Sequence, residues 1–156
     1  MRKEDVTSDL SSLAFNFFYW FSRFEFALKE NAYLKSHDIG AKAEAGWDDF
    51  VMMWGDQYAA SDEALSLLKA SPESQFIAAN DQLTWKTVDL TACKSELAKV
   101  VRLLKTIRNN LFHGGKHGGA GWDDSKRTAL LLSSGKTVLD QLATLASFEA
   151  DYTQHY

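Results

Sequence analysis

The stretch that decides the fold is residues 91–113, which read TACKSELAKVVRLLKTIRNNLFH. Its apolar side chains recur every three or four residues, the spacing of one face of a helix. This stripe comprises Leu97, Val100, Val101, Leu104, Ile107 and Leu111. Gly114 and Gly115 follow directly and favour an end to the helix. We therefore predict a long helix from about residue 91 to His113 that buries one face in a core.

Helical spacing also dominates the chain on either side of this stretch. It predicts helices over residues 7–33 (capped by Thr7 or Ser8), after Asp48, over 61–69 and over 123–152, where Gly135 is a candidate bend. Residues 75–88 have a mixed pattern, which leaves an ordered loop and a short hairpin open. Because 156 residues leave little room for a second core, we expect one all-α domain over residues 1–156. Its predicted architecture is an antiparallel bundle of four or five helices.

The first predicted helix is apolar on two sides. One side carries Leu10, Leu13, Phe17, Phe21, Phe24 and Leu28, and nearly opposite lie Phe15, Tyr19 and Phe26. A helix of this kind must be covered on both sides. Either it is the central helix of the bundle, or its second side meets a partner chain.

The net charge of −4 argues against loose binding of nucleic acid by the whole surface. The charge is uneven, however, because residues 101–127 hold six basic residues against two acidic ones. The single cysteine, Cys93, has no second cysteine to pair with, and we interpret it as a small buried thiol. The N-terminus lacks the pattern of a secretory signal, and the longest apolar stretch, residues 13–21, is too short to span a bilayer. We therefore expect a cytoplasmic protein with no membrane partner.

Arg108 is out of place on the helical wheel of residues 91–113. At 100° per residue it falls only about 20° from Leu97, in the middle of the apolar stripe. A buried, unpaired guanidinium is costly, so Arg108 needs an anion or a wet cleft. Asn109 and His113 are four residues apart and share a face at the end of the helix. The glycines after His113 leave the space beside it open to a ligand.

An arginine and a histidine without a cluster of carboxylates suit phosphate chemistry. A guanidinium donates hydrogen bonds in a planar fork to phosphate oxygens, and a histidine can take or give the proton of a hydroxyl near neutral pH. Lys105 and Lys116 add positive potential as candidate substrate-binding residues. His113 and His117 have the spacing of a metal pair, but the glycines around them disfavour a continuing helix. We therefore expect no metal and no cofactor.

Residues 108–116, RNNLFHGGK, resemble the signature of the HEPN superfamily (higher eukaryotes and prokaryotes nucleotide-binding domains). In that signature an arginine followed by a polar residue precedes a histidine by four to six residues. Here Asn109 is the polar residue, and four residues separate Arg108 from His113. Residues 21–29, FSRFEFALK, also resemble the opening helix of some bacterial members. The similarity extends to the order and length of the helices over most of the chain.

The resemblance implies an all-α homodimer that acts as a metal-independent endoribonuclease. It implies that Arg108, Asn109 and His113 of both chains line one cleft at the dimer interface. There an RNA 2′-hydroxyl attacks the adjacent phosphate, with His113 as general base or acid. Arg108 stabilises the phosphorane, and Asn109 orients the phosphate or His113. Such an interface also explains an arginine on an apolar stripe and a first helix that is apolar on two sides.

Two functional hypotheses follow. One is an RNA-cleaving toxin or defence component with an antitoxin or regulatory partner. The other is a non-catalytic nucleotide- or RNA-binding or dimerisation module on the same scaffold, because some members have lost catalysis. Some members also carry a tyrosine two residues after the histidine, which a nucleotidyltransferase modifies; here that residue is Gly115. A purely structural role stays open as well, in which Arg108 pairs with Glu25 or another acid and His113 merely ends the helix.

Overall fold

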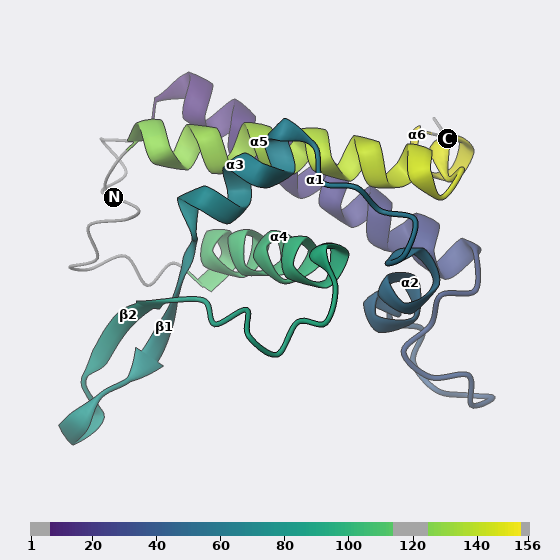
Figure 1. The fold of residues 1–156 in the computed structure, drawn as a ribbon, viewed down its shortest axis with the longest axis horizontal. Coiled ribbons are helices and arrows are strands. Elements are labelled where there is room, and N and C mark those ends of the chain that lie inside the picture. Colours follow the sequence, from purple (N-terminus) through teal and green to yellow (C-terminus); the bar gives the residue numbers. More distant parts are fainter. Residues whose placement is uncertain (1–6, 114–124, 154–156) are drawn as a thin grey trace.

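The computed structural model describes residues 7–113 and 125–153, with the side chains of residues 112–113 left out (Figure 1). In chain order the elements are α1 (Ser8–Glu30), α2 (Trp47–Trp54), α3 (Asp62–Ala70), β1 (Glu73–Ile77), β2 (Leu83–Thr87), α4 (Glu96–His113), α5 (Ser125–Leu145) and α6 (Glu149–Thr153). A single 3-10 turn, η2 (Ala79–Asp81), joins the two strands. The fold is mostly helical, as predicted.

Three long helices form the body of the molecule. Figure 1 shows α1 and α5 running side by side in the same direction, with α4 running the opposite way. Contacts along α1 and α5 agree with this direction, because Phe17 packs on Gly135 and Trp20 lies near Lys136. Helix α4 is therefore antiparallel to both α1 and α5, whereas α1 and α5 are parallel to each other. Between α1 and α4 the chain crosses the molecule through α2, α3 and the two strands and then returns. Helix α4 therefore runs opposite to α1, and α5 runs opposite to α4.

Gly135 allows α1 and α5 to approach closely. A Cβ at this position would lie 2.7 Å from Cε2 of Phe17, whose side chain is fully buried. The helix continues through Gly135, so it is not interrupted there. The break occurs instead at Ser147, which has a left-handed backbone (φ 57°) and separates α5 from α6. The single last helix predicted from the sequence is therefore two helices over the residues described.

Side-chain caps decide where the helices begin. The backbone N–H of Leu10 donates to Oγ1 of Thr7 at 3.2 Å, which confirms the predicted start of α1. Helix α4 begins at Glu96, later than predicted, because Oγ of Ser95 accepts a hydrogen bond from the N–H of Ala98 at 3.1 Å. Residues 91–94, which were predicted to begin this helix, form a turn and a short irregular segment.

The predicted stripes of α1 and α4 meet in one core. Its fully buried members include Phe17, Phe21, Phe24, Leu28, Leu97, Val100, Leu104 and Ile107. The described residues cover the opposite side of α1 only in part: Phe15 is 66% exposed and Tyr19 is 40% exposed, whereas Phe26 is half-buried. Within the described part of the chain, one apolar side of α1 is therefore buried and the other is partly exposed.

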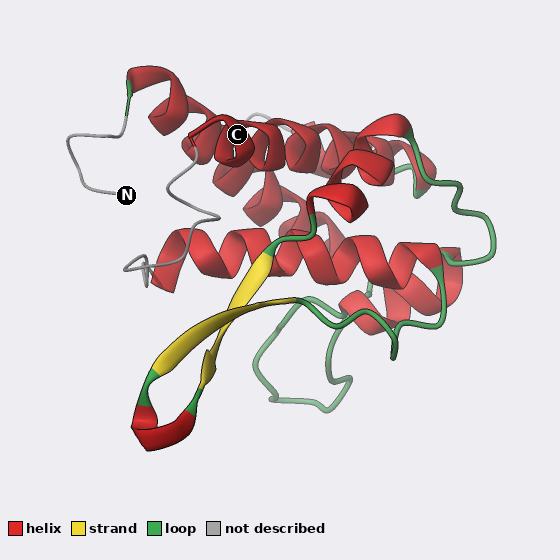
Figure 2. Cartoon of the chain, turned by 60° about the vertical axis from the view of Figure 1, so that its left-hand side comes forward, coloured by secondary structure: helices red, strands yellow, loops and turns green. Residues whose placement is uncertain are grey.

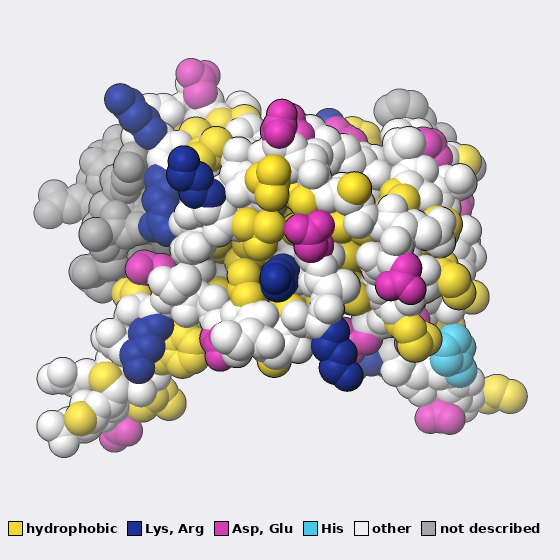
Figure 3. Space-filling view, viewed as in Figure 1, with side chains coloured by type: hydrophobic (Ala, Val, Ile, Leu, Met, Phe, Trp, Pro, Cys, Tyr) yellow, Lys and Arg dark blue, Asp and Glu magenta, His cyan; other side chains and the backbone are white. Residues whose placement is uncertain are grey.

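Strands β1 and β2 form an antiparallel hairpin that projects from the helical body (Figures 1 and 2). This decides between the two alternatives for residues 75–88 and corrects the all-α prediction by a small two-stranded sheet. The hairpin leaves Phe76, Ile77 and Leu83 exposed, and Figure 3 shows hydrophobic side chains on its surface. Among the described helices, none combines the length and the apolar character that a bilayer span requires.

Candidate functional site

Arg108 lies on α4 with its guanidinium directed toward α1. Nη2 lies 3.9 Å from Oε2 of Glu25, and the guanidinium carbon lies 5.6 Å from the centre of the Phe21 ring. Nη1 donates a hydrogen bond to Oδ1 of Asn109 at 3.0 Å. The side chain is 37% exposed, so its stem covers the apolar stripe while its charged end reaches the surface. The pairing with Glu25, one of the alternatives drawn from the sequence, is confirmed.

Glu25 is itself held from a second side. The indole N–H of Trp47 donates to Oε1 of Glu25 at 3.0 Å, and Trp47 is only 4% exposed. One carboxylate oxygen therefore accepts from a buried indole while the other faces Arg108. The hydrogen bond restricts the rotation of the carboxylate, and the carboxylate in turn positions the guanidinium.

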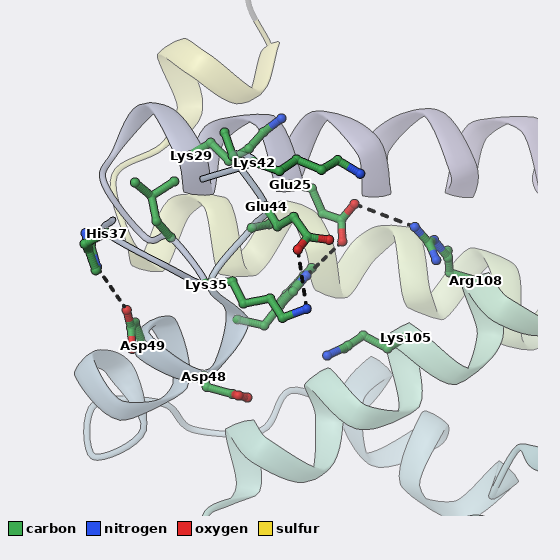
Figure 4. Close-up of a pocket in the computed structure, with 15 residues that line it drawn as sticks. Glu25, Lys29, Lys35, His37, Lys42, Glu44, Asp48, Asp49, Lys105 and Arg108 are labelled. Carbon is green, nitrogen blue, oxygen red and sulfur yellow. Dashed lines mark hydrogen bonds and ion pairs between the residues drawn. The ribbon is translucent and has the colours of Figure 1, made fainter. Parts of the chain in front are cut away.

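A cleft of about 740 Å³ lies beside this pair (Figure 4). On α4, Lys105 and Arg108 are three residues apart, and on α1, Glu25 and Lys29 are four apart, so each pair shares a helix face. All four residues line the cleft. Figure 4 shows Glu25 and Lys105 directed from the two helices toward the same space. Helices α1 and α4 thus each supply one wall of the cleft, and each wall carries two charged side chains on a shared helix face.

The loop between α1 and α2 forms a further wall. It folds back on itself through a pairing of Leu34 with Ala45, and the N–H of Lys35 donates to the carbonyl of Glu44 at 3.0 Å. The backbone at Gly46 passes so close to Leu34 that a Cβ there would lie 2.6 Å from the Leu34 carbonyl carbon. Only glycine fits this approach, which brings the loop's charged side chains to the cleft.

The residues predicted from the sequence separate into two groups. Lys105 and Arg108 line this cleft, whereas Asn109 lines a second cleft of about 930 Å³ between α2 and α4, which Lys105 also borders. His113 is the last residue of α4, and its side chain and the whole of Lys116 lie outside the described residues. The two clefts are therefore joined by Lys105, which borders both, and by the hydrogen bond between Arg108 and Asn109. The position of the histidine ring stays a prediction.

Part of the predicted basic patch has a structural role. Nη2 of Arg127 donates to the carbonyls of Ala70 and Ser71 at 2.7 and 3.0 Å, where α3 ends. It satisfies carbonyl groups that the end of a helix leaves open. Arg127 is therefore a poor candidate for direct substrate contacts, although it keeps its positive charge.

Sequence reasoning missed Lys29 and Lys42, which also line the first cleft. The spacing of Lys29 from Glu25 was a local signal for a shared face. Nothing local indicates Lys42, because its position depends on how the loop folds back. Cys93 is only partly buried and borders the second cleft, which corrects its interpretation as a buried thiol.

No family model matches this chain, and comparisons with curated proteins and with solved structures give no significant match. The resemblance to the HEPN superfamily therefore rests on residues 108–116 and 21–29 and on the order of the helices.

Proposed function

We propose that this protein is a metal-independent endoribonuclease with an Arg108–Asn109–His113 site. The observation that carries the proposal is the position of the Arg108 guanidinium. It lies 3.9 Å from the Glu25 carboxylate and 5.6 Å from the centre of the Phe21 ring, donates a hydrogen bond to Asn109, and is more than a third exposed beside a cleft. The remaining N–H groups of this planar cation can donate to the oxygens of a phosphate.

In the proposed reaction the RNA 2′-hydroxyl oxygen forms a bond to the adjacent phosphorus as the bond to the 5′ oxygen breaks. The 2′-hydroxyl loses its proton and the leaving 5′ oxygen gains one. His113 of one chain makes one of these transfers as general base or acid, and the His113 of the second copy makes the other. Arg108 stabilises the charge on the phosphorane, and Asn109 orients the phosphate or His113. The products are a 2′,3′-cyclic phosphate and a 5′-hydroxyl end, and the balance of the step requires no metal.

The proposal includes a homodimer with residues of both chains in one site. Its support is the uncovered side of α1, where Phe15, Phe18 and Tyr19 are exposed at 66, 38 and 40%. Contiguous exposed apolar side chains of this kind are typical of interaction sites. A second copy or a regulatory partner such as an antitoxin would cover them.

The direct test is cleavage of end-labelled mixed RNA in excess EDTA. We expect wild type to cut, with 2′,3′-cyclic phosphate ends, and Arg108→Ala and His113→Ala to lose at least about a hundredfold in rate. Lys99→Ala is the matched control, because this lysine carries the same charge on the same helix and lines neither cleft. Absence of cutting by wild type, or full cutting by both site variants, contradicts the proposal.

One observation favours the non-catalytic alternative, an RNA- or nucleotide-binding module. Arg108 already has a carboxylate partner in Glu25, which is a sufficient structural reason for its position. Under this alternative wild type binds RNA and leaves it intact. Growth inhibition on expression, relieved by His113→Ala, would favour the toxin form of the enzyme instead.

A further inference from the structure

We propose that the first cleft binds the phosphate backbone of a single RNA strand through Lys29, Lys42 and Lys105. The strand would continue from the phosphate held by Arg108, which lines the same cleft. This inference rests on the proposed function in taking RNA as the ligand. It assigns the cleft the role of holding the strand beside the point of cleavage.

The first argument is the state of the lysines. The ammonium groups of Lys29, Lys42 and Lys105 make no ion pair or hydrogen bond within the described part of the chain. They come from α1, from the loop and from α4, and all three residues line the cleft (Figure 4). Phosphates of a strand can neutralise such charges and release the counterions bound to the nucleic acid.

The second argument is that the acids of the cleft are largely engaged. Glu25 accepts from Trp47 and faces Arg108, as described above. Oε2 of Glu44 lies 3.4 Å from Nζ of Lys35, and Oδ2 of Asp49 lies 3.7 Å from Nε2 of His37. Asp48 lies in the first turn of α2, where the helix dipole stabilises a negative charge. The lining of the cleft holds five basic side chains against four acidic ones, so its formal charge with His37 neutral is +1. Lys29, Lys42 and Lys105 are the basic side chains of the cleft that have no acidic partner among the described residues.

The third argument concerns which part of a nucleic acid fits. At about 740 Å³ the cleft has the size of a site for a small ligand or a short stretch of strand. Among its lining residues Trp47 is 4% exposed and is packed in the core, so it offers no face for a base to stack on. Recognition through phosphates alone carries no sequence information. We therefore expect the cleft to bind strands with little dependence on base sequence.

The test is equilibrium binding of a fluorescent 2′-O-methyl oligoribonucleotide of about eight nucleotides, a length within the range of single-strand sites. This probe lacks the 2′-hydroxyl and is not cut, so binding is measured apart from catalysis. The triple variant Lys29→Ala, Lys42→Ala, Lys105→Ala should bind at least about tenfold more weakly. The logarithm of the binding constant falls linearly with the logarithm of the salt concentration. For the triple variant the slope of this line should be smaller in magnitude by about 2, since each lost phosphate contact contributes about 0.7. Probes of uridine and of adenosine should bind alike.

The matched control changes the same number of charges at lysines outside the cleft: Lys69, Lys86 and Lys99, each to alanine. It should bind within about threefold of wild type, and replacing the three cleft lysines by arginine should retain binding, since phosphate contacts need the charge. Equal losses in the two alanine triples, or no binding by wild type, overturn the inference. Cleft-dependent binding without cleavage of ordinary RNA supports the inference and contradicts the catalytic proposal alone.

Discussion

Glu25 offers the sharpest perturbation of the site, because its two carboxylate oxygens have different partners. In the wild type the indole N–H of Trp47 donates to Glu25 at 3.0 Å. Glu25→Ala leaves this buried N–H without an acceptor, which lowers the free energy of unfolding by about 1–3 kcal/mol. It also removes the ion pair with Arg108, whose side chains are 37 and 30% exposed; a pair this exposed contributes about 0–1 kcal/mol. Glu25→Gln keeps an acceptor for Trp47 and loses only the ion pair. We therefore expect the glutamine variant to lose less than about 1 kcal/mol and the alanine variant clearly more.

The assay is urea unfolding at neutral pH, followed by circular dichroism, for wild type, both Glu25 variants and Arg108→Ala. A double-mutant cycle between Glu25→Gln and Arg108→Ala measures the ion pair separately, and its coupling energy should be no more than about 1 kcal/mol. Equal losses for the glutamine and alanine variants would refute the reasoning, because the charge and not the indole hydrogen bond would then dominate.

Three further predictions concern stability. Gly135→Ala should destabilise the protein, because overpacking against the buried Phe17 ring costs about 1–3 kcal/mol and exceeds the gain in helix propensity of about 1 kcal/mol; an unchanged urea midpoint would contradict the packing. Tyr58→Phe should leave stability unchanged or raise it, since its buried hydroxyl has no hydrogen-bond partner among the described residues; a loss above about 1 kcal/mol would show that the hydroxyl is used. Burial, and then the charge and hydrogen bond of Asp140, raise the pKa of Tyr152 far above its usual value. The folded pKa exceeds the unfolded one, so this contribution to stability is complete below pH of about 10 and decreases above it, by up to about 1.4 kcal/mol per pH unit. Urea unfolding between pH 9 and 11 should show this decrease, and Tyr152→Phe should reduce the slope.

The helices could be predicted because their signals are local. Thr7 caps α1 as expected, and the apolar residues of α1 and α4 that were placed on one stripe lie in one core. The predicted start of α4, at about residue 91, lies upstream of the observed one, because Ser95 caps the helix and the residues before it form a turn. The relative direction of α1 and α5 could not be predicted, since it depends on the path of the intervening chain and not on any periodicity.

The site was predictable only in part, for a related reason. Arg108 is conspicuous on a helical wheel, and its pairing with Glu25 was among the alternatives. The cleft beside it depends on the fold-back of the loop between α1 and α2, which requires the close approach of Gly46 to Leu34. Such a contact between residues a dozen apart leaves no periodic pattern, so Lys42 gave no signal in the sequence.

The central claim is that Arg108 binds the phosphate that is cleaved. The most direct measurement is the single-turnover rate of RNA cleavage in EDTA for Arg108→Ala relative to Lys99→Ala. Each variant removes one positive charge from α4, and Lys99 lines neither cleft. We predict a rate at least about a hundredfold lower for Arg108→Ala, with Lys99→Ala close to wild type. Equal rates for the two variants would contradict the claim and leave Arg108 with the structural role that its contact with Glu25 already provides.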